Sequence, residues 1–419
     1  MKLSRFWLLA GWCLGILIIT NSFAQTQPIV EHYDAIEEDQ KLTLSQLVNL
    51  TVAKHPEQEW LQALETEAKA LQRRGDSWIA GAVETNLRYQ EATSGTLHYI
   101  DAGVQIPIWN IGQRQAERQV AYQAQLSAGS QTAAIRLKIA GLIRFAIWDI
   151  ALQKLRYQQT QTDLKNFETL LIKVKRRVVL GDLPKMDELL MQTELLQKRS
   201  ALVLAEAEVM HSRKRYISLT QTHKIPLHYR ELLVSISEIQ NNHPALIAIN
   251  HLIERKQAEI QALAKVGSGQ SNLAIGINSD RPSNQDSRSN NTESFNIGIT
   301  IPFAGEAHLA PQLAALYVEL NQLIAEQHQL HRDLELAHHE AEHNLAVNRA
   351  EMEIATELKQ VAEQHLKMTE LSFSVGETDL LDLLKIQART QQAVLNAQER
   401  ALILQRDYAF YNQSVGVSP

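Results

Sequence analysis

The segment from His338 to His343 reads HHEAEH and contains the pattern His339-Glu340-x-x-His343. On a helix, two histidines four residues apart lie on one face and can bind the same Zn²⁺ ion. The glutamate between them can act as a general base toward a metal-bound water. The pattern therefore raises the hypothesis of a secreted zinc hydrolase.

The residues after His343 do not supply the HxxGxxH continuation of a metzincin zinc site. Glu353 or Glu363 could be proposed as a third ligand, but glutamate recurs at helical spacing throughout this stretch. We therefore expect a non-enzymatic protein without a cofactor, and keep the zinc hydrolase with His339, Glu340 and His343 as a distant alternative. The same solvated helix face is expected to carry the other histidines of this stretch, which are His328, His331, His338 and His365.

The beginning of the 419-residue chain has the features of a secretion signal. Lys2 and Arg5 precede an apolar run, and small residues stand just before Gln25, so we expect residues 1–24 to be removed. The single cysteine, Cys13, lies in that segment, which excludes disulfides and cysteine-based metal sites from the mature chain. Loss of two positive charges changes the net charge from −6 to −8, which argues against a nucleic-acid partner.

The chain contains two copies of one pattern, separated by a constant 195 residues. GVQIPIW at Gly103 is similar to GITIPFA at Gly298, and LGDLPKMDELLMQ around Gly181 is similar to VGETDLLDLLKIQ around Gly376. A constant spacing between separate blocks indicates rigid, equally long elements between them. We therefore expect two units, residues 25–223 and 224–419, built from the same succession of elements.

Each unit contains two segments in which apolar and polar residues alternate, at about 79–92 and 97–109, and at about 271–280 and 294–303. Strict alternation of this length predicts strands. Apolar residues on one side and small or polar residues on the other are typical of a transmembrane β-barrel. The alternative is a pair of strands packed on a soluble core.

Long stretches almost free of proline and glycine follow the strands in both units. Helices of this length would extend roughly 100 Å, at about 1.5 Å per residue. Each is interrupted at a glycine, within the expected hairpin ends at about 178–187 and 373–382. Pro184 can begin the next helix in the first unit, and Thr378 is a plausible N-cap in the second.

Four strands cannot form a membrane barrel by themselves, because open strand edges are not stable in lipid and bacterial barrels need at least about eight strands. The chain is therefore expected to share a barrel with copies of itself. Two copies would give eight strands and a filled interior, and three would give twelve strands and a possible pore. A periplasmic coiled-coil scaffold would explain the helices but not the strands.

This arrangement resembles the TolC-like outer-membrane efflux family over essentially the whole mature chain. The resemblance is carried by LTLSQLVNLTVAKHPE, by the strand-to-helix joints GVQIPIWNIGQRQAERQVAYQAQ and GITIPFAGEAHLAPQLAALYVELNQ, and by the two hairpin ends. It implies a mainly α-helical chain with a small β part, assembled as a homotrimer with a trimeric α-barrel and a shared 12-stranded transmembrane β-barrel. It also implies outer-membrane location in a Gram-negative bacterium, with the helical barrel in the periplasm.

The resemblance further implies a passive exit duct that binds a periplasmic adaptor and works with an inner-membrane resistance-nodulation-division pump. The segments IPFAGEAHLAPQLAA and GETDLLDLLKIQ are most similar to the heavy-metal, CzcC-type branch. Export of heavy-metal cations is therefore expected, while multidrug efflux and type I protein secretion stay open as alternatives.

The family places adaptor contacts and the periplasmic aperture at the hairpin ends. The matching docking residues here are Arg177, Leu180, Gly181, Val375 and Gly376, and the aperture residues are Asp187, Asp379, Asp382 and Lys385. Asp382 matches an aperture acid of the best-known members, but Lys385 stands where they have a second acid. Asp382 could instead pair with Lys385, and both aspartates could serve as first-turn acids that suit a helix N-terminus.

Overall fold

A computed structural model describes residues 35–91, 97–282 and 292–419. The expected signal segment and Cys13 lie outside the described residues, and every described element belongs to the compact unit Asp34–Pro419. The elements, in chain order, are β1 (Glu37–Asp39), α1 (Leu44–Lys54), α2 (Glu57–Asp76), β2 (Glu84–Glu91), β3 (Leu97–Ile108), α3 (Gln113–Val179), α4 (Lys185–Thr220), β4 (Lys224–Pro226), α5 (Pro244–Val266), β5 (Ser271–Pro282), β6 (Thr292–Thr300), α6 (Glu306–Val375) and α7 (Leu380–Ser414).

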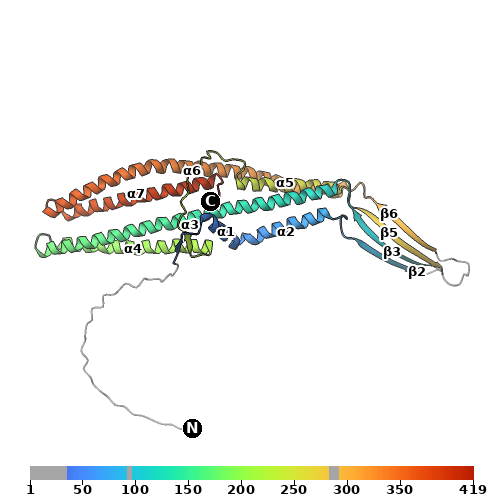
Figure 1. Cartoon of the computed structure of the whole chain (residues 1–419), viewed down its shortest axis with the longest axis horizontal. Coiled ribbons are helices and arrows are strands. Elements are labelled where there is room, and N and C mark those ends of the chain that lie inside the picture. Colours follow the sequence, from blue (N-terminus) through green and yellow to red (C-terminus); the bar gives the residue numbers. More distant parts are fainter. Residues whose placement is uncertain (1–34, 92–96, 283–291) are drawn as a thin grey trace, which may run out of the picture. The chain divides into compact units, whose positions relative to one another are not determined.

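Two long helical hairpins make up most of the described chain. Helix α3 has 67 residues and α6 has 70, and α4 and α7 return along them (Figure 1). Helix α6 begins at Glu306 and contains Pro311 in its second turn. It therefore starts before the proline-free stretch from which the sequence predicts a helix. The mainly helical fold with a small sheet that the sequence predicts is thereby confirmed.

Both hairpins end in the same way, with a glycine in the left-handed backbone region. Gly181 and Gly376 each have φ +83°, a value that favours glycine over residues with a Cβ atom. The next residue closes each helix, since the Asp182 N–H donates to the Arg177 carbonyl and the Glu377 N–H donates to the Ser372 carbonyl, both at 2.9 Å. These are the six-residue hydrogen bonds of a Schellman motif.

The second helix of each hairpin begins differently. Pro184 precedes the first residue of α4 and supplies the fixed φ that suits a helix start. The prediction that Thr378 caps α7 is wrong, because Asp379 is the N-cap and its side chain accepts a hydrogen bond from the Asp382 N–H at 2.7 Å. An aspartate in this place also suits the positive end of the helix dipole.

The helices pack side by side as a row. Towards the hairpin ends α4 contacts α3, α3 contacts α7 and α7 contacts α6. Towards the strands the contacts run from α2 to α3, from α3 to α5 and from α5 to α6. Elements of the first unit therefore lie at one edge of each row, and α6 lies at the other.

The strands form one antiparallel sheet in the order β2-β3-β5-β6. Its register aligns the alternating residues across all four strands. One transverse row consists of Leu87, Ala102, Ile277 and Phe295, and the neighbouring row on the opposite face consists of Arg88, Asp101, Asn278 and Ser294. Among the described residues, β2 and β6 each pair with one strand only, so both edges of the sheet are open.

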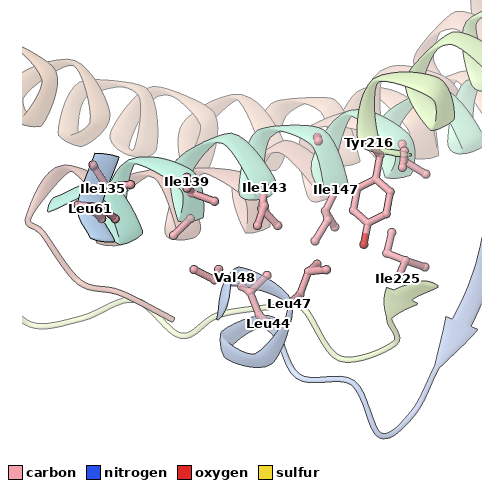
Figure 2. Packing of buried hydrophobic residues seen from close by; sticks show 13 residues of the cluster. Leu44, Leu47, Val48, Leu61, Ile135, Ile139, Ile143, Ile147, Tyr216 and Ile225 are labelled. Atoms are coloured by element: carbon pink, nitrogen blue, oxygen red, sulfur yellow. The ribbon is translucent and has the colours of Figure 1, made fainter. Parts of the chain in front are cut away.

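The largest hydrophobic core lies where α1 packs on the middle of α3 (Figure 2). On α3, Ile135, Ile139, Ile143 and Ile147 follow one another at intervals of four residues and form one apolar stripe. Figure 2 shows this stripe facing α1 residues such as Leu47, with Tyr216 of α4 and Ile225 of β4 at one end. Burial of these side chains fixes the small β1–β4 segment and α1 against the long hairpin.

A buried arginine joins this core to the second unit. The Arg144 side chain on α3 is fully buried, and its guanidinium donates two hydrogen bonds to the Glu231 carboxylate, at 2.8 and 2.6 Å. It also donates to the Gln413 side chain and, at 3.1 Å, to the Val417 carbonyl. One cation thus ties α3, the connection between the units and the end of the chain together.

Replacement of this arginine by methionine is expected to lower the free energy of unfolding by about 3–5 kcal/mol, because the Glu231 carboxylate would lose its partner in a largely dry environment. Urea unfolding of the full chain in detergent, followed by circular dichroism, measures the change. Lys154→Met is the control, since Lys154 and Glu38 form an exposed pair that should contribute no more than about 1 kcal/mol. Equal effects of the two substitutions would contradict the role assigned to Arg144.

Candidate functional site

The two hairpin ends lie against each other and share one hydrophobic cluster. Its buried members are Phe167, Leu171, Val174, Met191 and Leu195 from the first hairpin, and Phe373, Leu380, Leu383 and Leu384 from the second. Side chains from α3, α4, α6 and α7 therefore bury one another at this level. This shared core holds the predicted docking and aperture residues within one structural unit.

Arg177 makes the polar contact between the two ends. Its guanidinium donates a hydrogen bond to the Phe373 carbonyl at 2.8 Å and stacks over the Phe373 ring, 4.8 Å from its centroid. Gly376 lies beside this contact. The family resemblance predicts Arg177 as a docking residue. In the structure its side chain is half-buried and bridges the two hairpin ends.

The other predicted docking residues are exposed. Leu180 and Val375 both have about two thirds of their surface accessible, and Gly181 and Gly376 occupy the turns beside them. Large apolar side chains in solvent at both ends are available for contact with another molecule.

The predicted aperture residues are largely engaged with their own helices. Asp379 caps α7, and Asp382 accepts a hydrogen bond from Lys385 at 3.1 Å, the pairing that the sequence left open. Asp187 lies in the first turn of α4, next to Glu188. The Lys185 ammonium donates a hydrogen bond to the Glu188 carboxylate, and this contact lowers the pKa of Glu188.

Exposed apolar residues also recur at heptad spacing on the two edge helices. The row on α4 is Met186, Leu189, Leu196 and Val203, and the row on α6 is Ile354, Leu358, Val361, Met368 and Val375. Such rows are typical of a helix that packs on another helix. One end of each row lies next to a hairpin end. The two rows would therefore lie side by side if α4 of one chain packed against α6 of another. The sequence shows the periodicity, but only the structure shows that these rows lie on the uncovered edges.

The histidines of the HExxH pattern lie on the exposed surface of α6. The rings of His339 and His343 are nearly parallel, with centroids 6.4 Å apart, and Glu340 is also exposed. In the described part of the chain, no group of three or more histidine, cysteine, aspartate or glutamate side chains is arranged to hold a metal ion.

His338 corrects the prediction of a uniformly solvated histidine face. It is buried, its Nε2 lies 3.0 Å from the Ser237 carbonyl oxygen, and its ring packs on Tyr411 with centroids 5.2 Å apart. His338 therefore helps to attach the connection between the units and the C-terminal segment to α6. Helical spacing alone could not separate it from its exposed neighbours, because the covering segment comes from elsewhere in the chain.

Within the described helices, no stretch is both long and apolar enough to cross a membrane.

No family model matches the sequence, and no curated protein matches it either. Solved structures do match the fold. A structure of CusC, described in terms of folding and transmembrane channel formation, has a TM-score of 0.72 at 13% identity, covering 91% of this chain and 93% of that one. The outer membrane protein VceC from Vibrio cholerae has a TM-score of 0.71 at 12% identity, covering 90% and 96%.

The open state of the Neisseria gonorrhoeae MtrE outer membrane channel has a TM-score of 0.68 at 13% identity, covering 94% of this chain and 97% of that one. At these identities the likeness establishes the fold. The chain therefore has the fold of TolC-like outer-membrane channels over nearly its whole length, and the matched structures are channel and membrane proteins rather than enzymes.

Arg177→Met is expected to loosen the contact between the hairpin ends, because it removes both the hydrogen bond to the Phe373 carbonyl and the stacking on its ring. Loss of about 1–2 kcal/mol would speed local amide exchange roughly tenfold around residues 371–378. Hydrogen–deuterium exchange with mass spectrometry measures this. Arg176→Met is the matched control, since Arg176 is exposed and its side chain forms no hydrogen bond or ion pair with the described residues. Similar exchange in both variants would refute the bridging role.

Proposed function

We propose that this chain is the outer-membrane subunit of a tripartite efflux system, in which copies of the chain close into a ring and form a passive exit duct. The observation that carries this proposal is the four-stranded sheet, which combines two open edges with one exposed apolar face and one polar face. The fold shared with outer-membrane channels supports the same function.

The exposed face of the sheet has the chemistry of a lipid-facing surface. Leu87, Ile277, Phe295, Ile297 and Ile299 are all exposed large apolar residues, and the register places them on one face. Left in water, such a surface would be an aggregation risk, whereas in a bilayer it is favourable.

The opposite face is suited to a water-filled interior. There the Asn86 side chain donates to the Asp101 carboxylate at 3.3 Å, and the amide of Asn278 lies between Asp101 and Asn296, donating to the Asp101 carboxylate at 2.6 Å. Gly103 and Gly276 pair with each other in the neighbouring row, and the Asn86 and Asn296 side chains lie over them, so polar groups cover this face. Polar interior and apolar exterior together are the pattern of an outer-membrane barrel.

Closure of a ring would pair the open strand edges and also cover the exposed apolar rows of the edge helices. The β2 edge of one copy can pair with the β6 edge of the next, and the apolar row on α4 can pack on the row on α6. Because the two edges of a chain differ, this contact is head-to-tail, and it gives a closed ring when the rotation between neighbouring copies closes. Three copies would give the 12-stranded barrel and trimeric α-barrel that the resemblance implies.

The hairpin ends are proposed as the adaptor-docking positions and the periplasmic aperture, with the helical barrel in the periplasm. Their exposed apolar residues and ordered glycine turns support this assignment. Export of heavy-metal cations is the proposed cargo, and it rests on the resemblance of IPFAGEAHLAPQLAA and GETDLLDLLKIQ to the heavy-metal branch. Acids repeated around an axis, such as Asp379 at the second hairpin end, would favour cations there.

Membrane assembly tests the proposal most directly. Cells are fractionated, and the product is run unheated in mild detergent; we expect a heat-modifiable trimer in the outer membrane, and a soluble monomer would refute the channel. Ile297→Arg should reduce the trimer, because arginine on the lipid face costs about 2–4 kcal/mol near the bilayer centre. Asn296→Arg is the matched control on the opposite face of β6 and should leave the trimer intact.

Deletion of the gene followed by panels of metal salts, drugs and protein-secretion assays tests the cargo. Greatest sensitivity to divalent metals is expected, and sensitivity to drugs alone would replace the metal assignment. Gly376→Pro should abolish resistance but leave the trimer in the outer membrane, because proline requires φ near −65° and Gly376 has φ +83°. Full resistance in this variant would contradict docking at the hairpin end.

A further inference from the structure

The two hairpin ends occupy equivalent positions in the repeat but carry opposite charges. With the spacing of 195 residues, Lys175 is equivalent to Glu370, so a cation in the first end becomes an anion in the second. Arg176 is likewise equivalent to Leu371, and Lys173 to Met368. The backbone turn is the same at both ends, so the fold does not require this difference.

The imbalance extends over the whole of each end. We call residues 172–189 the basic end, which has five lysines and arginines and three acidic residues, a net charge of +2. The equivalent residues 367–384 are the acidic end, with one lysine and four acidic residues, a net charge of −3. Opposite fields of this size at neighbouring positions select partners of different charge.

At the basic end the cations outnumber the acids among the charged groups that have no side-chain partner in the described chain. Lys173, Lys175 and Arg176 are exposed and make no ion pair or side-chain hydrogen bond with any described residue, although the charge of Lys175 helps to lower the pKa of Glu188. One acid of this end is already engaged, because Glu188 accepts a hydrogen bond from Lys185. The surface offered to a partner is therefore positive.

At the acidic end two carboxylates are free, against one exposed cation, Lys367. Glu370 and Glu377 are exposed and form no ion pair within the described chain. The cation Lys385 beside this end is engaged with Asp382. A partner that approaches here meets negative charge.

Exposed apolar side chains accompany the charges at both ends. Val179 at the basic end is 86% exposed, and Ile172 precedes it by two helical turns on the same α3 face. Met368 and Leu371 project from α6 at the acidic end, both about 70% exposed. Apolar residues rimmed by charge are typical of protein-docking surfaces, in which the charges set orientation and partner choice.

We propose that each copy of the chain offers two non-equivalent docking positions to its periplasmic protein partner. The basic end receives an apolar segment flanked by carboxylates, and the acidic end receives one flanked by lysine or arginine. The partner is thereby held in one rotational register around the ring. This inference rests on the proposed function and adds the chemistry that the partner must present.

The competing use of these charges is contact between copies, in which a basic end would pair with the acidic end of the next copy. Exchange of the two charges separates the alternatives. Lys175→Glu, Glu370→Lys and the double variant are expressed as full chains in the deletion strain, and resistance is measured with the compound to which that strain is most sensitive. The amount of heat-modifiable trimer is measured in parallel.

Each single variant should lower resistance by roughly fivefold, the effect of losing one exposed charge pair, with an unchanged amount of trimer. The double variant should be at least as sensitive as either single variant, because an external partner then meets the wrong charge at both ends. Lys165→Glu, an exposed position on α3 outside the basic end, should keep full resistance.

Recovery of resistance in the double variant would overturn the inference, since it would show that the two ends pair with each other. Full resistance in both single variants would overturn it as well. Failure of the proposed function looks different, because the deletion strain would then show no sensitivity and the unaltered chain would not form a trimer in the outer membrane.

Discussion

The open edges of the four-stranded sheet are the constraint on which the rest of this protein depends. Backbone groups at a strand edge must find hydrogen-bond partners, most urgently where no water is present. Among the described residues, β2 and β6 find none on their outer sides, while the sheet exposes an apolar face. In the proposed assembly, a neighbouring copy of the chain would pair with these edges, and the bilayer would cover the apolar face.

The helices repeat the same arrangement on a larger scale. Elements of the first unit form one edge of the helical row and α6 forms the other, with apolar heptad rows left uncovered on α4 and α6. In the proposed ring, the edges of the sheet and of the helical row would both face neighbouring copies. Between them the Arg144–Glu231 pair and the shared cluster at the hairpin ends hold the two units of one chain together.

The spacing of 195 residues that the sequence predicts would make Arg144 and His339 equivalent positions. Arg144 is nevertheless buried in an ion pair, whereas His339 lies on the exposed surface of α6. The HExxH pattern is therefore a local property of one helix surface. At the hairpin ends the backbone is preserved and the charges are inverted, which points to selection by an external partner rather than by the fold.

The sequence by itself determined the mainly helical class, the alternating strands and the glycine turns, because these depend on local periodicity and backbone preference. It did not determine that His338 is buried, that Asp379 rather than Thr378 caps α7, or that Arg177 bridges the two ends. Each of these depends on a residue distant in sequence or on the exact backbone geometry of a turn. Only the tertiary structure decides which of several equally spaced side chains faces a neighbouring helix.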